Sequence, residues 1–85
     1  MNELNIEAHG FEFAAEVERK DQTRLRALAQ SFLDAVDCEM TAGRIELAIE
    51  YIDEAAACLR ECECHRIEAE RYEDAARRAR EARSA

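Results

Sequence analysis

The fold depends most on residues 44–83, which have the sequence RIELAIEYIDEAAACLRECECHRIEAERYEDAARRAREAR. This stretch contains neither glycine nor proline, the two residues that most disfavour a helix interior. Its small and apolar residues recur at spacings of three and four, which indicates one face of an amphipathic helix. The members of this stripe are Ile45, Ala48, Ile49, Ile52, Ala55, Ala56, Leu59 and Cys62, followed more weakly by His65, Ala69, Tyr72, Ala76 and Ala79.

The length of this helix raises a problem of packing. A straight helix over residues 44–83 would be about 60 Å long. A compact domain of 85 residues has a radius of gyration of only about 12 Å. We therefore expect the helix either to extend beyond the rest of the domain or to break near residues 62–65, where its weakest helix formers cluster.

A second helix is predicted over residues 21–42, where apolar residues again recur at spacings of three and four. Asp21 can cap its start, and Gly43 can adopt the left-handed conformation that ends a helix. Its apolar stripe consists of Leu25, Leu28, Ala29, Phe32, Val36 and Met40.

Residues 42–56, AGRIELAIEYIDEAA, resemble the second helix of a tetratricopeptide hairpin over these 15 residues. Gly43, Ile45, Ala48, Ile52 and Ala55 match the small and apolar positions of that motif. The preceding helix has Glu39 where the motif has its aromatic residue and Val36 where the motif has its glycine. The resemblance implies two antiparallel helices joined by a short turn, and not a repeat array.

Residues 1–20 have a different pattern. Leu4, Ile6 and Ala8 alternate with polar residues, and after His9-Gly10 the alternation resumes at Phe11, Phe13, Ala15 and Val17. Alternation with a period of two predicts strands, and a two-residue loop containing glycine predicts a β-hairpin. The alternative is a helix over residues 11–20, because alanine and glutamate are good helix formers.

The predicted fold is therefore mainly α (α+β), a single domain over residues 1–85. It consists of a β-hairpin in residues 1–20 and an antiparallel hairpin of two helices, residues 21–42 and 44–83, with the second helix open to a break near 62–65. The predicted core consists of Leu4, Ile6, Phe11, Phe13, Val17, Leu25, Leu28, Phe32, Val36, Ile45, Ile49, Ile52 and Leu59.

The charge balance argues against several classes of partner. The net charge is −8, and residues 1–64 alone hold 15 acidic and 6 basic residues. A protein that binds nucleic acid directly usually has a basic surplus. No apolar run approaches the roughly 20 residues that span a bilayer, and no signal peptide is recognisable. We expect a cytoplasmic protein that contacts neither nucleic acid nor membrane.

Cys58, Cys62 and His65 share one face of the predicted helix and are residue types that bind zinc. The spacing offers no fourth ligand, and free cysteine is commonly a small apolar core residue. We expect no bound metal and no cofactor, with a thiol- or zinc-based sensor as the alternative. Catalysis is not expected either, because no activated cysteine with a base and an orienting group is recognisable.

The surplus of acid suggests a binding face for a larger protein with a basic surface. We expect a regulatory or inhibitory protein, similar in composition to phage and mobile-element inhibitors such as anti-CRISPR or nucleic-acid-mimicking proteins. The candidate partner-binding residues are Asp34, Asp37, Glu46, Glu50, Asp53, Glu54 and Glu61.

A homodimer, in which the chain is a helical dimerisation module, is the other alternative. The predicted second helix is too long for the predicted first helix to cover, and uncovered apolar stripes are normally buried by a partner. The stripe expected to bind a second copy or another protein consists of Leu59, Cys62, Ala69, Tyr72, Ala76 and Ala79.

Overall fold

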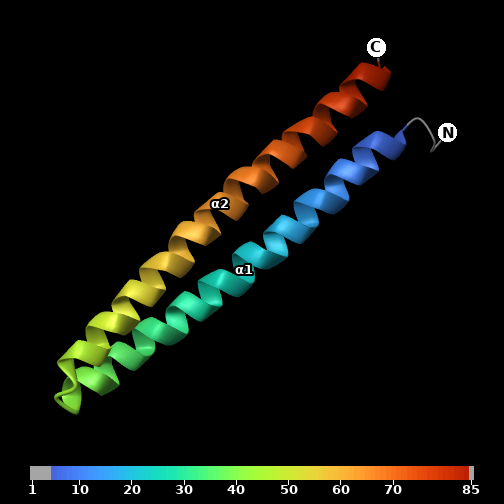
Figure 1. Ribbon diagram of the computed structural model, residues 1–85. Helices are drawn as coiled ribbons and strands as arrows, with labels where there is room; N and C mark the ends of the chain where they lie inside the picture. Colours follow the sequence, from blue (N-terminus) through green and yellow to red (C-terminus); the bar gives the residue numbers. More distant parts are fainter. Residues whose placement is uncertain (1–4, 85) are drawn as a thin grey trace.

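The computed structural model describes residues 5–84, with side chains from 5 to 82. Helix α1 spans Ile6–Thr41 and helix α2 spans Ile45–Ser84 (Figure 1). The two run antiparallel, so the start of α1 lies beside the end of α2 and the connecting turn lies at the opposite end of the molecule. The result is a rod of 63 × 15 × 11 Å with a Cα radius of gyration of 19.0 Å. The predicted hairpin of two antiparallel helices is confirmed.

The predicted N-terminal β-hairpin is wrong. Helix α1 begins at Ile6, and no strand occurs between residues 5 and 84; Leu4 lies outside the described residues. The same letters satisfy two periods, because Ala8, Phe11 and Ala15 also fall at helical spacings of three and four. In the helix, Ala8 and Ala15 are buried. A long packed helix outcompetes an isolated two-stranded hairpin, which is only marginally stable in water.

Helix α2 is continuous from Ile45 to Ser84, so of the two alternatives left open by the sequence, the break near residues 62–65 does not occur. The reason is the added length of α1, which gives α2 a packing partner far beyond residue 59. The ring of Phe11 stacks on that of Tyr72 at a centroid distance of 6.4 Å. The Cys62 thiol donates to the carbonyl oxygen of Gln22 over 3.3 Å. The first contact involves the part of α1 that was expected to form strands, and the second lies just beyond it.

The interface between the helices, which we call the seam, is built from small residues. Buried positions recur every seven residues, which is the pattern of two helices packed side by side. Narrow side chains let the helices approach closely, and larger residues such as Phe32 and Tyr51, with ring centroids 5.8 Å apart, lie between them. The buried residues are Ala8, Ala15, Gln22, Leu25 and Ala29 in α1, and Ala48, Ala55, Cys58, Cys62, Ala69 and Ala76 in α2.

Much of the predicted core is therefore on the surface. Leu25 is buried and Phe32 packs against the central cluster, as expected. In contrast, Ile6 and Phe13 are 67% and 69% exposed. The sequence suggested that the largest apolar residues face inward, but the buried positions are those that repeat every seven residues along both helices. The other predicted core residues that are exposed are Val17, Leu28, Ile45, Ile49, Ile52 and Leu59.

The turn between the helices has the geometry expected at Gly43, whose φ of +81° is in the left-handed region. The Gly43 amide donates to the Met40 carbonyl over 3.0 Å, and the Arg44 amide donates to the Glu39 carbonyl over 2.8 Å. This pair of hydrogen bonds is the Schellman motif, which satisfies the last carbonyls of a helix. The prediction that Gly43 ends the first helix in a left-handed conformation is thus confirmed.

Candidate functional site: an apolar flank on the acidic half of the hairpin

One side of the seam is lined by residues that also repeat every seven positions. Near the chain ends these residues form ion pairs between the helices: Arg19 Nη2 lies 2.9 Å from Glu73 Oε1, and Arg80 Nη2 lies 2.7 Å from Glu12 Oε2. These two contacts fix which residues of α1 and α2 face each other along this side.

Continued toward the turn, the same register places Leu33 opposite Leu59 and Met40 opposite Ile52. Ile45 precedes Ile52 by seven residues and extends the row to the start of α2. We call Leu33, Met40, Ile45, Ile52 and Leu59 the apolar flank. Each of these side chains is between 41% and 54% exposed. The same side of the hairpin therefore changes from paired charges to uncovered apolar surface at about its midpoint.

The charge is divided in the same way. We call residues 27–59 the turn half, and residues 5–26 with 60–84 the terminal half. The turn half holds seven acidic residues and one basic residue, so it carries −6 of the net charge of −8. The seven acids are Asp34, Asp37, Glu39, Glu46, Glu50, Asp53 and Glu54, and the single base is Arg44.

Most of the acid in the turn half has no counter-charge. Glu39 pairs with Arg44, whose guanidinium holds the pKa of that carboxyl below its usual range. Asp34 accepts a hydrogen bond of 2.8 Å from the Gln30 amide. The remaining five acids form no ion pair with any residue between 5 and 82. The candidate partner-binding residues predicted from the sequence lie in the turn half and are exposed, except that Glu61 lies just beyond it.

The terminal half is neutralised internally. It contains every other ion pair found among the described residues, including Glu63–Arg66–Glu70 and Asp74–Arg77–Glu81. The hydrogen bonds from Arg80 lower the pKa of Glu12, and those from Arg19 lower the pKa of Glu73. Arg77, Arg78 and Arg80 near the end of α2 are thus paired with acids of the same chain.

A polar layer lies in the middle of the seam. His65 Nδ1 lies 2.7 Å from Glu18 Oε1, and both side chains are largely shielded. The buried Gln22 accepts a hydrogen bond of 2.8 Å from Arg19 Nη1 through its side-chain oxygen. The His65–Glu18 contact joins the two helices and forms only in this alignment, so it specifies the register, a role well known for buried polar groups between helices.

The predicted metal-binding face is occupied by this packing. Cys58 and Cys62 are buried in the seam, and His65 is turned toward Glu18. Within residues 5–84 no group of three or more potential ligands is placed to hold a metal ion. The cysteines are free thiols, two of them buried and two, Cys38 and Cys64, exposed.

The stripe predicted to bind a second copy is largely covered by α1. Cys62, Ala69 and Ala76 are buried, and Tyr72 stacks on Phe11. Ala79 is half-buried, and Leu59 belongs to the apolar flank. The mismatch of helix lengths that motivated the dimer disappears, because α1 has 36 residues and covers nearly all of α2.

Sequence reasoning missed the apolar flank because three of its five residues, Ile45, Ile52 and Leu59, are predicted core residues. The signal was present in the spacing: Leu33 and Met40 are seven apart, as are Ile45, Ile52 and Leu59. Two apolar rows therefore run along the first half of α2, one of small residues and one of large residues. Only the small row continues to the end of the helix.

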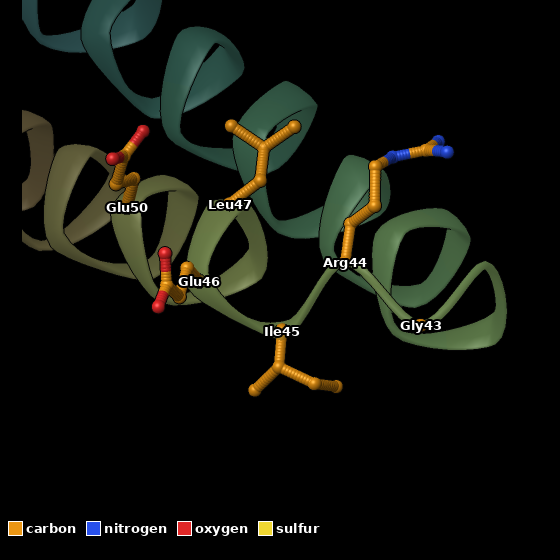
Figure 2. Close-up of a pocket in the computed structure, with 6 residues that line it drawn as sticks. All are labelled: Gly43, Arg44, Ile45, Glu46, Leu47 and Glu50. Carbon is orange, nitrogen blue, oxygen red and sulfur yellow. The ribbon is translucent and has the colours of Figure 1, made fainter.

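An open hollow lies at the start of α2, outside the seam. Its lining consists of Gly43, Arg44, Ile45, Glu46, Leu47 and Glu50 (Figure 2). Figure 2 shows Leu47 pointing toward α1, whereas Ile45 points to the opposite side. These side chains do not converge on one enclosed volume, so the hollow offers no arrangement suited to catalysis.

Neither helix is long and apolar enough, over the described part of the chain, to cross a membrane. Comparison with protein-family models, curated proteins and solved structures found no match for this chain.

Proposed function

We propose that this chain is a non-catalytic protein-binding module that uses its turn half to occupy a basic surface on a larger protein and thereby regulates or inhibits it. One observation carries the proposal. The half of the hairpin that exposes the apolar flank also holds −6 of the net charge of −8.

The two properties have complementary effects on association. Uncompensated acid steers a basic partner toward the turn half and selects against acidic partners. The apolar flank supplies affinity, because its removal from water is favourable and does not depend on salt in the same way. The terminal half, with its internal ion pairs, gains little from a charged partner and serves as a scaffold.

The shape of the chain also suits binding. Its accessible surface is 6108 Å², whereas a compact monomer of 9.7 kDa exposes about 5,100 Å². The excess of roughly 1,000 Å² is comparable to the ~800 Å² that each partner contributes to a standard interface. A rod of two helices thus presents an interface-sized area without a large fold.

The compartment that we propose is the cytoplasm. The exposed thiols of Cys38 and Cys64 are unpaired in the structure, and thiols of this kind persist in reducing compartments. Binding assays should therefore be done under reducing conditions.

Affinity capture from the native host tests the proposal. The tagged full-length chain is compared with a variant carrying Asp37→Lys and Asp53→Lys in the turn half. The control carries Glu7→Lys and Glu16→Lys, an equal change of charge on exposed residues of the terminal half. We expect the turn-half variant to lose a captured protein that the control retains. Equal capture by both variants would contradict the proposal.

A further inference from the structure

We infer that the apolar flank binds an amphipathic α-helix with basic margins, supplied by the partner, which lies along both helices and completes a three-helix bundle. This inference rests on the proposed function and names the structural element that the turn half recognises.

The geometry of the flank fits a helix. Its side chains come from both α1 and α2, so a helix lying along this side would contact both. From Ile45 to Leu59 is 14 residues, or about 21 Å of helix. That length matches about four turns of a partner helix, whose residues at i, i+3, i+4 and i+7 would face the flank. Ile49, which is 53% exposed, widens the apolar surface on the α2 side.

The charges that border the flank indicate which charge the partner helix carries. Asp37 on α1 lies at the helical position next to the flank, and Glu46 and Asp53 hold the corresponding outer positions on α2. All three are exposed and form no ion pair among the described residues. A helix with an apolar stripe between lysine and arginine residues would therefore meet opposite charge along both edges.

The same charges argue against a second copy as the occupant. Two turn halves packed flank to flank would bring −6 against −6. The only base in the turn half is Arg44, which is already paired with Glu39. Like charges placed together across an interface oppose association.

A synthetic peptide tests the inference. The probe is an 18-residue helix-forming peptide with leucines at i, i+3, i+4 and i+7 and lysines on both sides of that stripe. Its binding to the full-length chain is measured by titration calorimetry under reducing conditions. We expect one peptide per chain, and no binding by a peptide of identical composition whose scrambled order destroys the stripe.

Two matched variants locate the site. Ile52→Lys places a charge in the flank, and Ile67→Lys makes the same change on an exposed residue of α2 in the terminal half. We expect Ile52→Lys to weaken binding at least tenfold and Ile67→Lys to leave it within twofold. Thermal unfolding of each variant shows that the fold is retained. Absence of binding, equal binding of the scrambled peptide, or equal affinity of both variants would overturn the inference.

Two further results separate this inference from the proposed function. If capture of the native partner requires Asp37 and Asp53 but not Ile52, the proposed function stands and the helix-binding flank is wrong. If capture requires none of the three, both are wrong. Light scattering covers the competing occupant: a species of twice 9.7 kDa that Ile52→Lys converts to the monomer would assign the flank to a second copy and overturn the inference.

Discussion

Individual alanines set how closely the two helices approach. Ala55 is 1% exposed in the seam, whereas Ala57, two residues later, lies on the outer surface. The two positions have the same residue type in the same helix, and they differ only in what surrounds the methyl group. Burial of small residues therefore matters here through the space that they leave for the opposite helix.

This contrast gives the first prediction. Ala55→Leu should lower the free energy of unfolding by about 1–3 kcal/mol, because the seam has no room for three more carbon atoms. Ala57→Leu should change it by less than about 0.5 kcal/mol, as surface substitutions usually do. Urea denaturation followed by circular dichroism measures both. Equal tolerance of the two substitutions would show that the helices do not pack through this row.

The polar layer shows the same dependence on position at the scale of single residues. Gln22 and Cys62 occupy seam positions that alanine fills elsewhere, and each is held by a hydrogen bond. A buried polar group costs free energy when it loses its partner. Because the Cys62 thiol donates to the Gln22 carbonyl of the other helix, the layer disfavours a shift by seven residues that the alanines alone would tolerate.

At the scale of elements, the conformation of residues 6–20 is the largest difference between the sequence prediction and the structure. The glycine at position 10 was expected in the turn of a β-hairpin, where its conformational freedom would be needed. In the structure it is inside α1, exposed, with no atom within 4 Å of where a Cβ would be. The two glycines of the chain therefore have opposite roles.

The second prediction compares them. Gly10→Ala should stabilise the protein by about 0.5–1 kcal/mol, because alanine is the better helix former and meets no obstruction. Gly43→Ala should destabilise it by about 1–2 kcal/mol, since a φ of +81° is unfavourable for a residue with a Cβ. Thermal melts of the two variants are sufficient. Destabilisation by Gly10→Ala would contradict a helical conformation at residue 10.

The third prediction concerns the ion pair between the helices at Arg19 and Glu73. In the folded chain Arg19 lowers the pKa of Glu73 below the usual 4.5. A carboxyl whose pKa is lowered on folding contributes stability above its unfolded pKa, and this contribution is lost as the pH falls through the folded value. The stability difference between wild type and Glu73→Gln should therefore shrink as the pH is lowered from 7 to 3.

The comparison with a variant isolates the Arg19–Glu73 pair, because every other group of the chain is the same in both proteins. Glu16→Gln is the control, since Glu16 is exposed and forms no ion pair among the described residues. Its difference from wild type should be small. Chemical denaturation at each pH supplies the measurement, and a pH-independent Glu73→Gln difference would show that the pair contributes nothing.

At the scale of the whole molecule, the rod shape distinguishes this structure from the compact domain that the length suggested. The Cα radius of gyration is 19.0 Å, compared with about 12 Å for a compact chain of this size. A rod has little interior, and the chain therefore buries one long row of small residues instead of a central cluster of large ones.

The fourth prediction is that small-angle X-ray scattering of the reduced monomer gives a radius of gyration near 19 Å and a maximum dimension slightly above 63 Å. The reason is that α1 supports α2 over nearly its full length. A radius near 12 Å would mean that α2 breaks and folds back. Concentration series with light scattering distinguish the rod from an assembly of two chains.

The sequence alone was sufficient for helical structure in residues 44–83, but not for its continuity, and it was also sufficient for the turn at Gly43 and the excess of acid. Each of these depends on local properties: helix propensity, the need of a left-handed residue for glycine, and a count of charges. The candidate partner-binding acids could also be identified from the sequence, because a count of charges does not require knowledge of their neighbours. The sequence could not show, however, that Glu12 and Glu73 pair with arginines of the facing helix.

Only the tertiary structure decided which apolar row of α2 faces inward. Two rows of α2 could be buried against α1. One row consists of Ala48, Ala55 and Cys62, and the other, which is the more hydrophobic, consists of Ile45, Ile52 and Leu59. The row of small residues is the buried one, because it continues through Ala69 and Ala76, where it packs against a row of buried residues in α1. That match exists only if residues 6–20 are helical, and their local pattern fits either conformation. The energy that selects the helix comes from contacts with residues about 60 positions away, which no local pattern contains.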